Sequence, residues 1–174
     1  MRELWGFVIA VPKETFDLNA LLEEVKGKAM EEKRGNPQGI VTNLMVLVRE
    51  GEKAMELFHL FLEWGDEREK REVAHLITKL AQSLGKVKAA LHCCEVWFVE
   101  SKDPKALSVR PSLHPERKEG ILVVVWQKGK VQAHLARIER TEDGKICLGD
   151  WEVTEQGEET GLWAPLFQVL NGGS

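Results

Sequence analysis

Residues 121–126 read ILVVVW, and this uninterrupted apolar run constrains the fold more than any other segment. Successive side chains of a strand point to opposite faces of a sheet, so a strand with one solvated face alternates between apolar and polar residues. Here both faces are apolar, and each therefore needs a cover. A helix is expected over one face, and either the N-terminal helix or a second subunit over the other.

Two segments have apolar residues at helical spacing. The first follows Asp17, a good N-cap, and should stop before the turn-forming residues 35–39, GNPQG. The second follows Gly65 and Asp66, starts with the charged run DEREKRE at 66–72, and should end at Gly85, where a C-terminal cap belongs. The sequence therefore predicts two amphipathic helices, one near the N-terminus and one in mid-chain.

Several runs are typical of strands. Residues 53–64 fit both a helical stripe and an alternating strand, and residues 162–170 fit a short helix or an apolar strand. The clearer strand candidates are residues 40–48, 87–99, 120–127, 131–138 and 146–153. The last three should form an antiparallel meander, because Lys128-Gly129 and residues 142–144 are suited to tight reversals.

These elements predict an α+β fold, a mainly antiparallel sheet packed by one long amphipathic helix plus an N-terminal helix. A chain of 174 residues suits one domain, 1–174, which we divide into an N-terminal helical extension, 1–39, and an α+β core, 40–171. The terminal residues 172–174, GGS, are expected to fray.

Composition excludes some classes of protein. The net charge is −4 with both signs interspersed, which disfavours a nucleic-acid protein that works by bulk positive charge. No leader and no apolar run near the length of a membrane helix occurs, so we expect a soluble, cytoplasmic protein without a membrane partner.

Cys93, Cys94 and Cys147 are odd in number, and no disulfide framework is expected. Glycine-rich phosphate motifs are absent, and we predict no cofactor and no resident metal.

The loop at residues 108–119, SVRPSLHPERKE, concentrates chemical groups beside the apolar strand. Loops held by a rigid strand often carry binding and catalytic groups. Candidates for binding are Arg110, His114, Arg117, Lys118, Trp97 and Trp126. Six tryptophans accompany no tyrosine, and an indole exposed near this loop would add a flat, amphipathic contact surface.

Glu95, His114 and Glu119 are the candidates for catalysis. If the strands that carry them are neighbours, the three could converge, with His92 as a fourth member, and bind a divalent metal or supply an acid and a base. The simpler alternative pairs Glu119 with Arg117 or Arg110 and leaves His114 to cap its loop. A metal site built on His92 with Cys93 or Cys94 lacks the usual ligand spacing, and Ser112 lies in no recognised nucleophile motif.

The motifs Glu95-Val96-Trp97, Arg110-Pro111-Ser112, His114-Pro115 and Arg117-Lys118-Glu119 stand together before an apolar strand. This combination resembles small uncharacterised proteins of phages and bacteria over about residues 65–127. The resemblance implies that residues 53–64 form a strand, and it implies no activity. The N-terminal forty residues lie outside it.

These observations favour a non-catalytic binding or accessory module, phage-like and self-associating, with a protein partner or a second copy of itself. Its recognition surface would be the loop from Arg110 to Glu119 with nearby tryptophans. One alternative is a metal-assisted hydrolase that uses Glu95, His114 and Glu119. The other is a nucleic-acid-binding protein that uses Arg110, Arg117 and Lys118.

Overall fold

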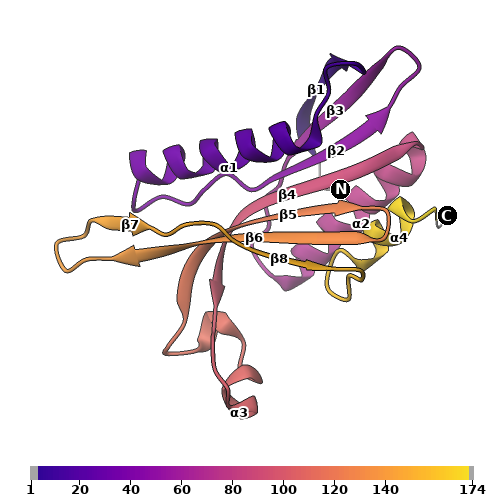
Figure 1. The fold of residues 1–174 in the computed structure, drawn as a ribbon. Coiled ribbons are helices and arrows are strands. Elements are labelled where there is room, and N and C mark those ends of the chain that lie inside the picture. Colours follow the sequence, from indigo (N-terminus) through magenta and orange to yellow (C-terminus); the bar gives the residue numbers. More distant parts are fainter. Residues whose placement is uncertain (1–3, 173–174) are drawn as a thin grey trace.

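In the computed structural model, residues 4–172 are described, and they form one antiparallel sheet with helices on both faces (Figure 1). The strand order is β1-β3-β2-β4-β5-β6-β7, and β8 also pairs with β6. The strands are β1 (Trp5–Pro12), β2 (Leu44–Glu50), β3 (Ala54–Phe61), β4 (Val87–Phe98), β5 (Lys118–Gln127), β6 (Lys130–Arg140), β7 (Ile146–Leu148) and β8 (Glu152–Gln156). The helices are α1 (Leu18–Gly35), α2 (Glu67–Leu84), α3 (Pro104–Leu107) and α4 (Ala164–Leu170), with a 3-10 turn at Pro111–Leu113. The α+β prediction is confirmed.

The central strands are buried on both faces, as the run ILVVVW requires. On one face, the apolar side of α1 packs on Val46, Leu91, Ile121 and Val123. On the other, α2 and α4 pack on a second cluster that includes Trp126. The second cover of β5 is therefore the N-terminal helix, one of the two covers that the sequence allowed.

Local sequence signals place both long helices. Asp17 accepts a hydrogen bond from the backbone N–H of Asn19 and caps α1, which runs through Gly35, one residue beyond the expected stop. The Oδ1 atom of Asp66 accepts from the backbone N–H of Glu69 at 2.8 Å and caps α2, and Gly85 ends that helix with φ +66°. The carboxylates of Asp17 and Asp66 thus satisfy backbone N–H groups that the start of a helix leaves unpaired.

The N-cap bond of Asp66 should contribute to the stability of the protein. Replacing Asp66 by alanine should lower the free energy of unfolding by about 1 kcal/mol, because the N-cap hydrogen bond is lost. Urea denaturation measures the change. Glu67→Ala in the same turn is the control, since Glu67 makes no capping bond and should change stability less. Equal effects of the two substitutions would contradict the capping role.

Two open alternatives are decided by the structure, and one expectation was wrong. Residues 53–64 contain a strand, β3, which pairs with β2 as a hairpin and with β1 on its other side. The single strand expected at residues 146–153 was wrong, because Gly149 and Asp150 divide it into β7 and β8, which pair with opposite halves of β6. Residues 162–170 contain a helix, α4, which begins at Ala164, and no strand.

Residues 1–39, expected as a helical extension, take part in the sheet and its packing as far as they are described. β1 forms the edge of the sheet next to β3, and α1 covers one face. The expected fraying at residues 173 and 174 lies outside the described residues. Among the helices in 4–172, none is long and apolar enough to cross a membrane.

The chain between β4 and β5 leaves the sheet and returns to it. Residues 99–117, which we call the arm, contain α3 and the 3-10 turn and project from the body below the sheet (Figure 1). The two ends of the arm are held together, because Phe98 pairs with Lys118 across β4 and β5. The loop predicted to carry function is therefore part of a projecting segment anchored on two central strands.

Candidate functional site

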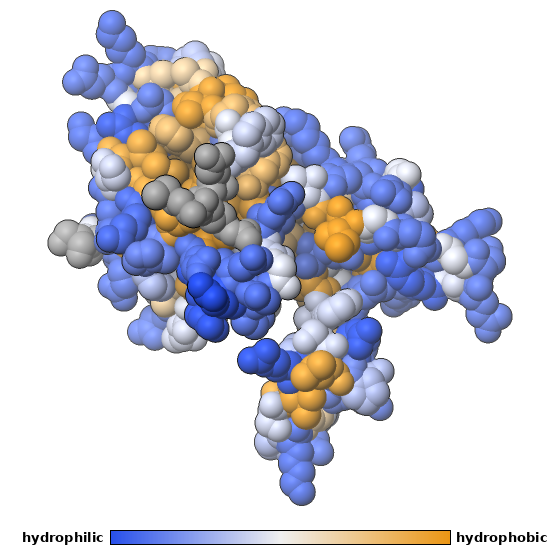
Figure 2. Space-filling view, turned by 180° about the vertical axis from the view of Figure 1, so that it is seen from behind, coloured by the Kyte–Doolittle hydropathy of each residue, from blue (hydrophilic) through white to orange (hydrophobic). Residues whose placement is uncertain are grey.

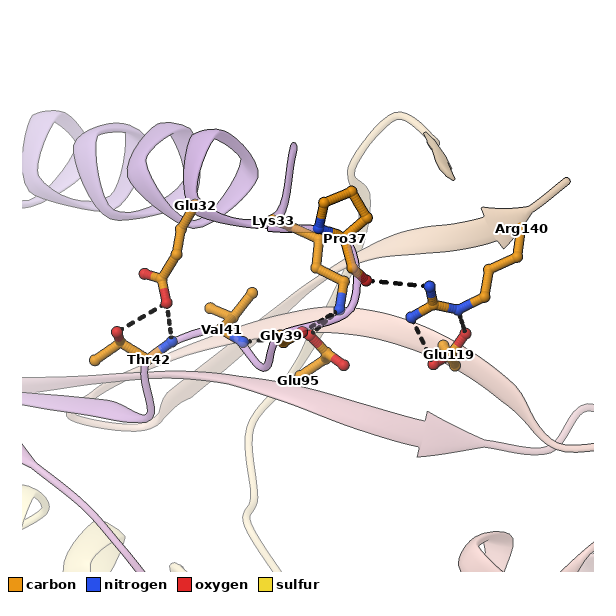
Figure 3. Close-up of polar contacts among 9 residues, drawn as sticks. All are labelled: Glu32, Lys33, Pro37, Gly39, Val41, Thr42, Glu95, Glu119 and Arg140. Atoms are coloured by element: carbon orange, nitrogen blue, oxygen red, sulfur yellow. Dashed lines mark hydrogen bonds and ion pairs between the residues drawn. The ribbon is translucent and has the colours of Figure 1, made fainter. Parts of the chain in front are cut away.

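Glu95 lies in β4 on the face that α1 covers, where one of its carboxylate oxygens has two hydrogen-bond donors. Its Oε1 atom accepts hydrogen bonds from Lys33 Nζ at 2.8 Å and from the backbone N–H of Val41 at 3.3 Å (Figure 3). Lys33 is 1% exposed and also donates to the carbonyl oxygen of Gly39 at 2.7 Å. Glu95 therefore fastens the end of α1 and the loop after it to the sheet.

Glu119 is engaged with a different partner. Arg140 donates to both of its carboxylate oxygens, from Nε at 2.7 Å and Nη2 at 3.2 Å, and also to the carbonyl oxygen of Pro37 at 3.1 Å (Figure 3). The expected pairing with Arg117 or Arg110 was wrong. Glu119 lies opposite Ile138 on β6, and Arg140 is the diagonal neighbour on the same face.

His114 lies in the arm, where it is 7% exposed. Its Nδ1 atom accepts from the backbone N–H of Glu116 at 3.0 Å, which stabilises the turn before β5. The structure thus gives Glu95, Glu119 and His114 separate partners. Across residues 4–172, no group of three or more histidine, cysteine, aspartate or glutamate side chains is arranged to hold a metal ion.

The predicted binding cations have different surroundings. Arg117 lies 4.5 Å from the ring centre of Trp97 and donates to the carbonyl oxygen of Ser112. Lys118 is 3.7 Å from the carboxylate of Glu100. Arg110 is exposed and lines an open cleft with Trp97. These contacts divide the predicted binding residues between the surface of the arm and the cleft.

The cleft has a volume of about 1170 Å³. Its floor is on the face of the sheet that α2 and α4 partly cover, and His92, Cys94 and Val124 of β4 and β5 line it there. Its walls include the segments that lead into α2 and α4, residues 40–43 before β2, the end of β4 and the start of the 3-10 turn of the arm. Seen from behind, the arm is a separate lobe at the bottom of the molecule and carries an apolar patch (Figure 2).

Four aromatic side chains of the cleft contact one another in a row. The ring centres of Trp126 and Trp163 are 6.1 Å apart, those of Trp163 and His92 5.3 Å, and those of His92 and Trp64 6.3 Å. All four side chains line the cleft. They come from β5, the segment before α4, β4 and the segment before α2, so the row forms only when the chain has folded.

The indole nitrogen of Trp126 is a buried donor without an acceptor. Trp126 is 1% exposed, and no described residue offers its Nε1 a hydrogen bond. Burial raises the pKa of the Glu159 carboxyl group, which also lines the cleft, and its side-chain interaction with the Trp126 indole opposes that rise. The geometry nevertheless leaves the N–H unpaired, at a cost of about 1–3 kcal/mol.

His92 supplies an acceptor. Its Nε2 atom lies 2.6 Å from Oδ1 of Asn43, so Nε2 carries the proton and Nδ1 has a free lone pair. Within residues 4–172, no hydrogen bond reaches Nδ1. Burial, aided by the Lys70 ammonium, lowers the pKa of His92 to about 3, and the ring is neutral at physiological pH.

The cysteines beside this site are not activated. Burial raises the pKa of Cys94 to about 11, an effect that the Lys70 ammonium only partly opposes, and it raises the pKa of Cys93 to about 12. A thiol with such a pKa is protonated at pH 7 and is a poor nucleophile. Cys94 therefore contributes volume to the cleft wall rather than reactivity.

No family model, curated protein or solved structure matches this chain. Sequence reasoning identified Trp126, Trp97 and Arg110, and it missed Trp64, Trp163 and Asn43 as parts of one cleft. The available signal was the excess of tryptophan, but nothing in the spacing of these residues showed which of them meet.

Proposed function

We propose that this protein is a binding module that holds an extended segment of a partner protein in the cleft. The unpaired Nε1–H of Trp126 is the observation that carries the proposal, because a ligand oxygen there would remove the cost of a buried, unsatisfied donor. The proposal retains a binding role, and it shifts the expected recognition surface from the loop alone to the cleft beside it.

A peptide backbone has the complementary groups. Its carbonyl oxygen can accept from Trp126 Nε1, and its N–H can donate to His92 Nδ1. Ala90 lies opposite Trp126 across β4 and β5, so His92 is the diagonal neighbour of Trp126 on the same face. Donor and acceptor are thus spaced to meet different groups of an extended chain, while the aromatic row contacts its side chains.

The size and charge of the cleft favour a peptide over other ligands. A volume of about 1170 Å³ exceeds the ~300–1,000 Å³ of most small-molecule pockets. Carboxylates outnumber lysine and arginine among the lining residues that the structure describes, with five glutamates at positions 63, 67, 69, 95 and 159 against Lys70 and Arg110. Nucleic-acid phosphates would meet repulsion there, so the cleft, which Arg110 lines, does not favour binding of nucleic acid.

A selection from a phage-displayed library of random peptides tests the proposal. Enriched peptides are synthesised, and their dissociation constants are measured by calorimetry against wild type and Trp126→Phe. The substitution keeps an aromatic ring and removes the N–H, so binding should weaken about 5–10-fold, the effect of one hydrogen bond. Circular dichroism verifies that the variant is folded.

Trp151→Phe is the matched control, because Trp151 packs near Lys26 on the opposite face of the sheet. It should leave the dissociation constant unchanged. A selection without a consensus sequence would contradict the proposal. So would enriched peptides that bind Trp126→Phe as tightly as wild type.

A further inference from the structure

β1 is an open edge of the sheet. It pairs with β3 in an uninterrupted antiparallel register from Trp5 opposite Phe61 to Pro12 opposite Ala54, without a bulge, and in the described chain it has no strand on its other side (Figure 1). Its outer edge therefore presents backbone N–H and C=O groups that can pair with another strand.

The side chains of β1 are exposed and apolar. Trp5 is 70% exposed, Val8 52%, Phe7 45% and Ile9 43%. The strand reads WGFVIAVP and contains no charged residue. On the face shared with α1, Phe7 stacks on His59 with ring centres 4.7 Å apart, and Trp5 packs on Phe61 with ring centres 4.9 Å apart. These contacts fix the orientation of the Phe7 and Trp5 rings.

The opposite edge of the sheet has the protection that β1 lacks. β7 spans only Ile146–Leu148, and β8 carries the acidic residues Glu152 and Glu155 in ion pairs with β6. Short strands and charged side chains are the usual defence of an edge against pairing with another chain. The contrast favours the pairing of the β1 edge with another strand.

We infer that two copies of this chain associate through β1, as antiparallel strands related by a two-fold axis at Val8. Antiparallel pairing of a strand with its own copy places residues that are equally far from the axis opposite one another. With the axis at Val8, Phe7 lies opposite Ile9 and Trp5 opposite Val11. On the other face, Gly6 lies opposite Ala10, and Val8 meets its own copy.

This register is self-complementary in size and charge. Each aromatic ring of β1 lies opposite a β-branched side chain, a favourable cross-strand pair, and the smallest residues face one another. Because β1 is uncharged, a second copy meets no like charge along the strand although the chain carries −4 overall. A second copy is therefore the occupant that the edge fits.

The surface area that the pairing buries sets the expected affinity of the dimer. The four exposed side chains offer ~400 Å² of apolar surface per copy, and the backbone edge and Phe61 add to it. Stable interfaces bury about 800 Å² per partner, so the pairing lies at the low end of specific association. The dimer should therefore dissociate on dilution, with a dissociation constant on the order of micromolar.

Sedimentation equilibrium of the full chain tests the inference. At concentrations from about 1 to 500 μM, the wild-type mass should rise from 19.7 kDa to twice that value. Val8→Lys should remain at the monomer mass, because two lysines would face each other at the axis. Val153→Lys is the matched control, since Val153 is 51% exposed on β8, and it should associate like wild type.

A cross-link tests the register independently. Directly opposed residues of antiparallel strands have Cα atoms about 4.5–5.5 Å apart, within the range of a disulfide. Val8→Cys, with the exposed Cys147 replaced by serine, should therefore form a covalent dimer on mild oxidation. Ala10→Cys in the same background should form much less covalent dimer. With the axis at Val8, residue 10 of one copy lies opposite Gly6 of the other, so the two cysteines are too far apart along the strands to bond.

Either of two results would overturn the inference. One is a wild-type chain that stays monomeric at 500 μM. The other is a dimer that persists unchanged in Val8→Lys, since its interface would then lie elsewhere. Equal cross-linking at positions 8 and 10 would reject the axis at Val8. None of these measurements involves the cleft, so the peptide-binding proposal stands or fails separately.

Discussion

Lys33→Ala is expected to lower the free energy of unfolding by about 3–5 kcal/mol, the typical cost of breaking a buried ion pair by removing one partner. Lys33 is 1% exposed and Glu95 is about one-seventh exposed at its side chain. Without the ammonium, the Glu95 carboxylate keeps only a long hydrogen bond from the backbone of Val41, and the carbonyl oxygen of Gly39 loses its donor. The Glu95 charge then has only the more distant attraction of Arg140, which forms its ion pair with Glu119.

Urea denaturation of the variant measures this loss. Lys28→Ala is the control on the same helix, because Lys28 forms an exposed pair with Glu24 and should change stability by less than about 0.5 kcal/mol. Lys33→Met combined with Glu95→Leu should recover most of the stability, since apolar residues remove both charges together. A loss below about 1 kcal/mol for Lys33→Ala would contradict the role assigned to the pair.

Acidification should destabilise the protein in a manner that depends on His92. The folded state holds the pKa of His92 at about 3, whereas the unfolded chain has the ordinary value near 6.5. Below pH 6.5 the unfolded state therefore binds a proton that the folded state does not. The free energy of unfolding should fall by up to about 1.4 kcal/mol per pH unit, and by about 4 kcal/mol in total between pH 6.5 and 3.

Denaturation curves at pH 7, 6, 5 and 4 give this slope for wild type and for His92→Gln. Glutamine keeps a donor for Asn43 and does not titrate, so the variant should lose stability less steeply with acid. Burial also lowers the pKa values of His59 and His134, and both add to the slope in wild type and variant alike. Parallel slopes would show that His92 takes up its proton without unfolding.

The fold could be predicted well where short-range patterns decide it. The caps at Asp17, Asp66 and Gly85 and the doubly apolar run at 121–126 specified two helices and a buried strand, and all were found. The division of residues 146–153 into two strands was not foreseeable in this way. It depends on the pairing of β7 with residues 138–140 of β6 and of β8 with residues 131–135, which is a property of the sheet and not of the segment.

The candidate site was only partly predictable. Glu95 and Glu119 were expected to converge if their strands are neighbours, and β4 and β5 do pair, but each carboxylate has its own partner, Lys33 or Arg140, far away in sequence. The cleft depends on tertiary contacts among Trp64, His92 and Trp163, which no local spacing encodes. The resemblance over residues 65–127 pointed to a strand at 53–64, and β3 is that strand.

The arm is a segment whose sequence and length can evolve while the sheet is preserved. Its ends are adjacent strand residues, Phe98 and Lys118, so any connection that spans one strand spacing preserves the sheet. Lengthening or shortening a loop alters its closure entropy only slowly, by about 0.6 kcal/mol per doubling. Insertions, deletions and grafted sequences in residues 99–117 can therefore reshape one wall of the cleft at little cost to folding, and new binding preferences can arise there while the scaffold stays the same.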